Sequence, residues 1–291
     1  MKKILFNGCC TAIATPFSND GINFEEFKKL IEFQISNGVN AIVVCGTTGE
    51  SSTMTMQERI DTIKCAVETS KGRIPIIAGT GSNNTFQAIQ MSKEAEKLGV
   101  DGLLIVTPYY NKTTQNGLIA HYSAIAQEVS LPIIMYNVPG RTGLNILPKT
   151  CLELSKIDNI VAIKEASGNL SQVAEIAHLC RDNLTIYSGN DDQILPILSL
   201  GGKGVISVLS NVKPKLVCDM IDNFFKGNIN KAISLQLDSI PLIKALFCEV
   251  NPIPVKSALS IIGFDFKNIR LPLVEMQDSN KEILEKELRK L

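Results

Sequence analysis

Eight short apolar stretches, set at fairly regular intervals, constrain the fold of this chain more than any other feature. Each is rich in residues that favour strands and is apolar almost without interruption. This pattern is typical of strands that are covered on both faces in a parallel sheet. The stretches span residues 10–17, 41–46, 74–80, 102–108, 132–137, 160–165, 184–189 and 204–210.

The segments between these stretches have the spacing of amphipathic helices. Residues 23–38 place apolar side chains on one face and end near a glycine, and residues 84–99 repeat this arrangement. Strand followed by helix, eight times over, predicts an α/β fold, a closed (β/α)8 or TIM barrel, over residues 1–227. Residues 228–291 have only helical patterns and are predicted to form a C-terminal helical domain.

Composition narrows the class of partner. Lysine plus arginine and aspartate plus glutamate both number 29, so no overall charge attracts nucleic acid or an anionic membrane. No apolar run reaches the ~18 residues of a membrane-spanning helix. Asn7 and Gly8 interrupt the apolar stretch that gives the N-terminus a weak likeness to a signal sequence. We therefore expect a small-molecule ligand, with no nucleic acid and no membrane as partner.

The residue types that usually bind metals are not clustered in the sequence. The eight cysteines include no Cys-x-x-Cys pair, and they are expected to be reduced, mostly buried thiols of a cytoplasmic protein. His121 and His178 lie on helical patterns, so neither a histidine base nor a metal centre is supported. The glycines of residues 201–207 precede a strand instead of opening a helix, which favours a tight turn over a phosphate site.

Polar or glycine-rich segments follow five of the predicted strands. In barrels of this kind the carboxyl ends of the strands meet at one mouth, where the chemistry takes place. These segments therefore converge, and convergence is more informative than any one motif. They are "GTTGES" at 46–51, "TPYYNK" at 107–112, "MYNVPGRTG" at 135–143, Lys164, and "YSGND" at 187–191.

Lys164 ends an apolar run that otherwise has the pattern of a buried strand. Burial of an unpaired charge is costly, so desolvation favours the neutral amine, which can attack a carbonyl carbon. The alternative is that Lys164 pairs with Glu165 or extends to solvent. For a lone lysine the alternative is the better interpretation, but the polar residues at the other strand ends favour the nucleophile.

Each companion of Lys164 also has a functional and a structural interpretation. Tyr136 closes the preceding strand and could move protons beside an amine, although a core tyrosine is the commoner case. Thr47 and Thr48 offer hydroxyls at a glycine-rich turn that could cradle a carboxylate, or could simply cap a helix. Arg141 could grip a carboxylate in bidentate fashion, or lie exposed in a loop.

The motifs "GTTGES", "TPYYNK", "YNVPGRTG", "IKEASGN", "YSGND" and "GGKGVISVLSN" occur in the order and spacing of one family. Over nearly its whole length the chain resembles the 4-hydroxy-tetrahydrodipicolinate synthases, also called dihydrodipicolinate synthases. The resemblance implies condensation of pyruvate with L-aspartate 4-semialdehyde to 4-hydroxy-2,3,4,5-tetrahydrodipicolinate. This is the first committed step toward diaminopimelate and lysine.

The resemblance also implies roles for individual residues. Lys164 matches the lysine that forms an imine with pyruvate. Tyr136, Thr47 and Tyr110 match a proton relay in which the last residue reaches in from a neighbouring subunit. No metal or dissociable cofactor is implied, because the iminium on Lys164 is itself the electron sink.

Four more positions match residues that hold the substrates. Arg141 corresponds to the arginine that binds the carboxylate of the semialdehyde, and Thr48 to a residue that cradles the carboxylate of pyruvate. Gly189 and Ile206 match positions that line the pocket. The family further implies a homotetramer built as a dimer of dimers. Tyr109 and Tyr110 are expected to be exposed aromatic residues that could anchor an interface.

One departure concerns feedback inhibition by lysine. Ser51, Asn83 and Tyr109 match residues that surround the effector in lysine-inhibited members. Met56 and Gln87 align with a histidine and an acidic residue that bind it there. An ammonium effector would lose a charged partner, so inhibition by lysine is not expected.

Two other functions are compatible with the same residues. Aldolases of keto-sugar acids, such as N-acetylneuraminate lyase or 2-keto-3-deoxygluconate aldolase, would share Lys164, Tyr136 and "GTTGE". Arg141 and the paired threonine hydroxyls fit a short amino-acid aldehyde better than a polyhydroxylated chain. A barrel that binds a keto acid without turning it over is the third alternative, although a binding module gains nothing from a nucleophilic amine.

Overall fold

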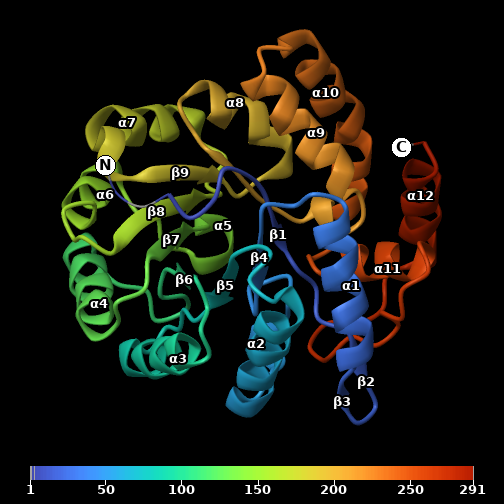
Figure 1. The fold of residues 1–291 in the computed structure, drawn as a ribbon, viewed down its shortest axis with the longest axis horizontal. Helices are drawn as coiled ribbons and strands as arrows, with labels where there is room; N and C mark the ends of the chain where they lie inside the picture. The colour runs from blue at the N-terminus through green and yellow to red at the C-terminus, as the bar shows by residue number, and fades with distance from the viewer. Residues whose placement is uncertain (1, 3, 291) are drawn as a thin grey trace.

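A computed structural model describes residue 2 and residues 4–290, and it confirms the predicted barrel. Eight parallel strands close in the order β1-β10-β9-β8-β7-β6-β5-β4, and helices surround them (Figure 1). The barrel strands are β1 (Gly8–Ala12), β4 (Ala41–Val44), β5 (Ile76–Gly79), β6 (Gly102–Val106), β7 (Ile133–Asn137), β8 (Ile160–Glu165), β9 (Thr185–Ser188) and β10 (Gly204–Ser207).

Helices of the barrel follow the strands as their capping residues predict. Asn23 accepts a hydrogen bond from the backbone N–H of Glu26 at the start of α1, and Thr55 forms a capping box with Glu58 at the start of α2. The helices are α1 (Phe24–Ser36), α2 (Met56–Ser70), α3 (Thr85–Lys97), α4 (Gln115–Glu128), α5 (Pro139–Thr142), α6 (Pro148–Leu154), α7 (Leu170–Cys180), α8 (Ile194–Ser199) and α9 (Pro214–Phe225). Short 3₁₀ turns lie at η1 (Ser51–Thr53), η2 (Arg181–Asn183), η3 (Asp191–Gln193) and η4 (Leu209–Asn211).

The first predicted strand, at residues 10–17, is wrong in its bounds. Strand β1 ends at Ala12, and Phe17 belongs to a separate antiparallel hairpin of β2 (Phe17–Ser18) and β3 (Gly21–Ile22). Pro16 stands between the two strands, and a proline has no backbone N–H to continue the ladder of the barrel.

Two apolar layers hold the barrel together. The outer layer joins the strands to the helices, and the inner layer fills the barrel. At the amino-terminal end the rings of Phe6 and Tyr187 stack with centroids 4.2 Å apart, and the Tyr187 hydroxyl donates to the Phe6 carbonyl at 2.8 Å. The interior is therefore closed at this end, so a ligand has to enter from the carboxyl ends of the strands.

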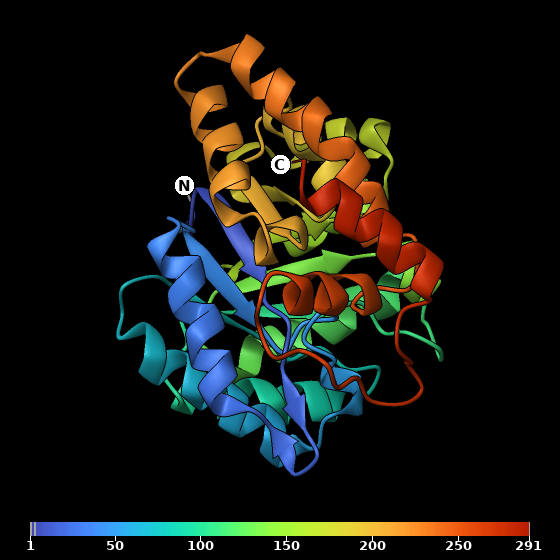
Figure 2. The ribbon, with the colours of Figure 1, turned by 90° about the vertical axis from the view of Figure 1, so that its right-hand side faces the viewer.

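The chain after the barrel is helical, as predicted. It forms α10 (Ile229–Leu246), α11 (Ile253–Ile261) and α12 (Asp278–Leu288). Helix α10 packs on α9 and α12, and all three C-terminal helices lie on one side of the barrel (Figure 2). Helix α9 ends at Phe225 and α10 begins at Ile229; a division into two domains at residue 228 stays a prediction.

The structure also bears on the cysteines, on one glycine of residues 201–207 and on membrane-spanning helices. All eight cysteines are free, and every one except Cys248 is buried. Gly204 begins β10, and a Cβ there would lie 2.0 Å from the carbonyl oxygen of Gly8, so close strand packing requires this glycine. Within residue 2 and residues 4–290, no helix is both long and apolar enough to cross a bilayer.

Candidate functional site

Lys164 and Tyr136 lie side by side at the mouth of the barrel. They are register partners on neighbouring strands β8 and β7. The Lys164 Nζ lies 4.3 Å from the centroid of the Tyr136 ring, and the two residues are only 5% and 7% exposed. The structure therefore brings the predicted nucleophile and the predicted proton carrier together in a mostly apolar interior.

Glu165 does not pair with Lys164. Its carboxylate accepts hydrogen bonds from the Asn137 side chain at 2.9 Å and from the backbone N–H of Ser167 at 2.7 Å. Alternation along β8 sends Lys164 into the barrel and Glu165 toward the helices. No salt bridge of Lys164 occurs in the part of the chain that the structure describes, so the structural alternative for this lysine has no support.

Gly189 borders the same lysine. A Cβ on Gly189 would lie 3.2 Å from the Lys164 Cε and 2.6 Å from the Ala166 Cβ, so only glycine leaves the lysine stem its space. Ile206 is fully buried in the inner layer. Asp191 lies two residues after Gly189 in the chain. Burial raises the pKa of the Asp191 carboxyl, and the positive charge of the nearby Lys164 opposes this rise.

A cavity of about 410 Å³ opens above this pair. Its wall includes the predicted site residues Thr47, Tyr136 and Arg141, contributed by the carboxyl ends of β4 and β7. Lys164 and Thr48 are not part of the wall. Lys164 contacts the ring of Tyr136, which is part of the wall, and Thr48 is the chain neighbour of Thr47.

The two hydroxyls of "GTTGE" have different surroundings. Thr47 is exposed in the cavity, whereas Thr48 is 2% exposed and accepts a hydrogen bond from Asn251 Nδ2 at 3.0 Å. The turn places Glu50 in the left-handed region, with φ of 54°, and buries its carboxylate against Lys256 Nζ at 2.5 Å. This buried ion pair fixes the turn that presents both threonines.

Comparison with known proteins decides the family. The model of the dihydrodipicolinate synthetase family matches residues 5–291. The chain belongs to this family. A 4-hydroxy-tetrahydrodipicolinate synthase of Clostridium acetobutylicum is 56% identical over 285 residues, which are 98% of this chain and 97% of the relative.

Two solved structures of dihydrodipicolinate synthases are similarly close. One is the chloride-inhibited enzyme of Acinetobacter baumannii complexed with pyruvate, with a TM-score of 0.95 at 42% identity, covering 97% of this chain and 98% of that one. The other is the Cyanidioschyzon merolae enzyme with lysine bound, with a TM-score of 0.96 at 40% identity, covering 99% and 98%.

Two residues matched to the dihydrodipicolinate synthetase family are not placed as the sequence suggests: one lies outside the cavity wall, and the other lies in a helix. Tyr110 is 91% exposed, outside the cavity wall, and adopts a φ of 69° that non-glycine residues rarely take. Arg141 lies on the cavity wall, but in the single-turn helix α5 rather than in a loop. Proline at the first helical position starts this turn.

The matched effector residues lie near the same cavity. Ser51, Gln87 and Tyr109 belong to its wall, Met56 is 43% exposed, and the carbonyl of Asn83 accepts a hydrogen bond from Asn111. In the described residues, no cluster of three or more histidine, cysteine or acidic side chains could hold a metal ion.

Sequence reasoning missed the C-terminal residues that reach the mouth. Asn251, Lys256 and Arg270 contact the segment after β4, although more than 200 residues separate them from it. Nothing in their local sequence signals this, because the contact depends on how the C-terminal helices fold back.

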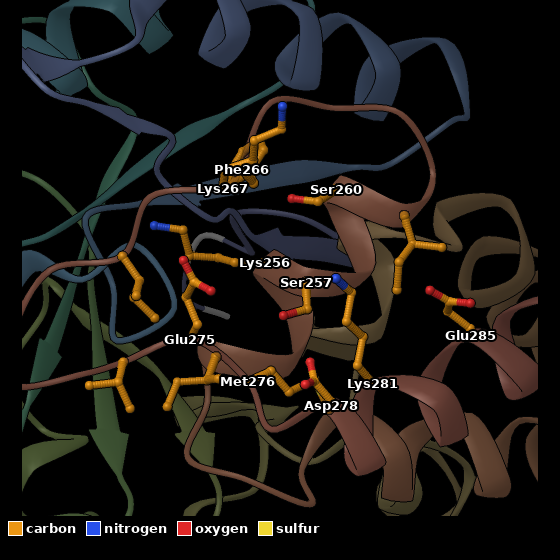
Figure 3. A pocket seen from close by; sticks show the side chains of 14 residues that line it. Lys256, Ser257, Ser260, Phe266, Lys267, Glu275, Met276, Asp278, Lys281 and Glu285 are labelled. Carbon is orange, nitrogen blue, oxygen red and sulfur yellow. The ribbon is translucent and has the colours of Figure 1, made fainter.

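A further cavity of about 540 Å³ lies between α11 and α12. Figure 3 shows Lys256 on the opposite side of this cavity from Lys281.

Proposed function

We propose that this chain performs the reaction of its family through a Schiff base on Lys164. The chain is a lyase, a 4-hydroxy-tetrahydrodipicolinate synthase that acts on the small molecules pyruvate and L-aspartate 4-semialdehyde. The observation that carries the mechanism is the buried Lys164 Nζ, free of a carboxylate partner among the described residues and 4.3 Å from the Tyr136 ring.

The chemistry starts with the Lys164 amine as the nucleophile. The Lys164 amine attacks the keto carbon of pyruvate, and loss of water gives an iminium. Loss of a methyl proton then gives an enamine, which attacks the aldehyde carbon of the semialdehyde. The amino group of the condensed product attacks the iminium carbon, closes the ring and releases Lys164. The iminium is the electron sink, so we propose that no metal or dissociable cofactor takes part.

The remaining roles are assigned by position. Tyr136 and Thr47 share the cavity wall and would relay protons, together with Tyr110 of a neighbouring subunit. Arg141 would bind the semialdehyde carboxylate at the cavity mouth. Thr48, which is buried next to Thr47, would cradle the pyruvate carboxylate, and Gly189 and Ile206 would shape the space around the imine.

Trapping tests the covalent step. Borohydride treatment with pyruvate should reduce the imine and add the mass of a reduced pyruvate unit to Lys164, as found by mass spectrometry of peptides. K164R should show no adduct and should lose roughly 10³-fold or more in kcat, because a guanidinium cannot form the imine. An unmodified Lys164 in the wild type would instead favour a keto-acid binding protein.

Substrate choice separates the synthase from the keto-sugar aldolases. We expect consumption of pyruvate with L-aspartate 4-semialdehyde and none with N-acetylmannosamine or glyceraldehyde. Arg141→Ala should raise KM for the semialdehyde about tenfold or more, because a charge-assisted hydrogen bond is lost. Turnover with only the sugar aldehydes would defeat this assignment.

We also propose that lysine does not inhibit this enzyme. Met56 and Gln87 stand where lysine-inhibited members are expected to have a histidine and an acidic residue, so the ammonium of lysine lacks a charged partner. A titration of steady-state activity should show less than about twofold inhibition at millimolar lysine. Strong inhibition at sub-millimolar lysine would contradict the proposal.

The working form of the enzyme is proposed to be a cytoplasmic homotetramer, a dimer of dimers. The eight free cysteines support a reducing compartment. The exposed Tyr110 and the 38% exposed Tyr109 support an interface beside the mouth, because large aromatic side chains are typical anchors of interfaces.

A further inference from the structure

Asn251 touches two of the residues proposed to hold substrate carboxylates. It lies between α10 and α11 and is 5% exposed. Its side-chain Nδ2 donates to Thr48 Oγ1 at 3.0 Å, and its backbone carbonyl accepts from Arg141 Nη2 at 3.3 Å. Side chain and backbone of one residue therefore serve two different parts of the site.

The direction of the side-chain hydrogen bond decides what Thr48 can do. A hydroxyl has one hydrogen to donate, and a substrate carboxylate can only accept. Because the Thr48 oxygen already accepts from Asn251, its hydrogen stays available for another acceptor. In the described part of the chain the Thr48 hydroxyl donates to no other group. Asn251 thus presets Thr48 as a donor.

The other side-chain atom of Asn251 argues against a purely structural role. Its Oδ1 is buried and has no hydrogen-bond partner among the described residues. A buried acceptor without a partner destabilises the folded protein, so an asparagine here is a poor choice for stability alone. The position is better explained by the donor that it offers to Thr48.

Neighbouring contacts hold Asn251 against the mouth. Lys256, on the helix that follows, forms the buried ion pair with Glu50, two residues beyond Thr48. Arg270 donates to the carbonyl of Thr53 at 3.0 Å and pairs with Glu58. The C-terminal segment is therefore fixed to the same turn at several points, and the Asn251 amide has little freedom to move away.

We propose that Asn251 is a positioning residue for recognition of the pyruvate carboxylate, acting by orienting the Thr48 hydroxyl as a donor. This inference rests on the proposed function, because it assumes that Thr48 meets the carboxylate of pyruvate. It predicts an asymmetry between the substrates. Substitution of the side chain removes the contact with Thr48 but leaves the backbone carbonyl that holds Arg141.

Two variants test the direction of the hydrogen bond. N251L keeps the number and branching of the side-chain heavy atoms and removes the donor, which should raise KM for pyruvate roughly threefold to tenfold. N251D also keeps the shape, but its carboxylate accepts the Thr48 hydrogen and repels an anion, so KM for pyruvate should rise about 30-fold or more. In N251L, which adds no charge, KM for the semialdehyde should stay within about twofold of the wild-type value.

A double variant separates positioning from general distortion. In a T48V background N251L should change KM for pyruvate by less than about twofold, since its effect passes through the Thr48 hydroxyl. A full effect in that background, or equal increases in KM for both substrates, would overturn the inference. Thermal unfolding of each variant checks the fold, and if N251D fails to fold, N251L alone and with T48V still decides the outcome.

Borohydride trapping on the wild type keeps the two proposals apart. If the wild type gives no pyruvate adduct on Lys164, the proposed function itself fails. If the wild type gives the adduct while N251L and N251D keep the wild-type KM for pyruvate, only the role of Asn251 fails.

Discussion

Gly189 shows how tightly a single residue limits the space around Lys164, the proposed nucleophile. The lysine stem passes so close to this glycine that a methyl group on Gly189 would contact the Lys164 Cε, and it would clash with the Ala166 Cβ at 2.6 Å. Real Cβ atoms do not approach so closely, so the neighbours of Gly189 have to shift. Rotation of Lys164 toward a keto carbon depends on this space.

G189A is therefore expected to slow imine formation about tenfold or more, because an attacking group has to be held within narrow limits. The measurement is the rate of borohydride-trapped adduct at saturating pyruvate. The double variant G189A/A166G removes the closest contact and should recover much of the rate. If G189A alone forms the trapped adduct at the wild-type rate, Lys164 has more room than the structure indicates.

At the scale of elements, a latch joins the C-terminal segment to helix α2. Arg270 forms a bidentate ion pair with Glu58, one bond being 2.9 Å long, and its guanidinium lies 4.1 Å from the centre of the Phe17 ring. The Arg270 guanidinium lowers the pKa of Glu58 to about 2. The same carboxylate accepts a hydrogen bond from the backbone N–H of Thr55 at the start of α2, so Glu58 both caps this helix and pairs with Arg270.

This latch predicts an acid dependence of stability. The pKa of Glu58 is lower in the folded state than in the unfolded chain. Its stabilising contribution is therefore complete above about pH 4.5 and disappears as pH falls toward about 2. With allowance for screening at this partly exposed site, E58Q should cost about 1–2 kcal/mol at pH 7 and flatten the loss of stability in acid.

The exposed ion pair of Arg73 with Glu32 provides the control for the latch, since Arg73 also donates to both carboxylate oxygens. E32Q should change the free energy of unfolding by less than about 0.5 kcal/mol, because exposed pairs contribute little. Urea unfolding from pH 2.5 to 7 measures both variants. Equal effects of E58Q and E32Q would argue against the latch.

At the scale of the whole molecule, a single chain lacks one of the proposed relay residues. Tyr110 projects into solvent, 91% exposed, while Tyr136 and Thr47 line the cavity. A closed symmetric assembly would bring an equivalent surface of a second chain to each mouth. The proposed mechanism is then complete only in the oligomer.

Mixed oligomers test this arrangement. Y110F and K164R should each be nearly inactive, since each lacks a group that the proposed mechanism uses. After dissociation and reassembly of an equal mixture, about a quarter of the sites should combine Lys164 of one chain with Tyr110 of another, and activity should return to that level. An inactive mixture, with hybrid oligomers confirmed by native mass spectrometry, would place Tyr110 at the site of its own chain. Wild-type activity of Y110F alone would place Tyr110 outside the reaction.

Much of this protein follows from local patterns. Continuous apolar runs predicted buried parallel strands, and parallel strands in a barrel bring their carboxyl ends to one mouth. Lys164 and Tyr136 were therefore predicted to meet, and the structure places them on neighbouring strands. The wrong bounds of the first strand arose because the apolar pattern continues past Ala12, where the strand ends.

Local patterns alone determined the barrel and the strand-end residues at its mouth, because periodicity and strand ends are properties of neighbouring residues. Only the tertiary structure decided that Thr47 faces the cavity while Thr48 is buried against Asn251, 203 residues away. It also decided that Glu50 pairs with Lys256, 206 residues away. Such contacts depend on the path of the whole chain, and a side chain gives no sign in its own segment of the distant partner that folding brings to it.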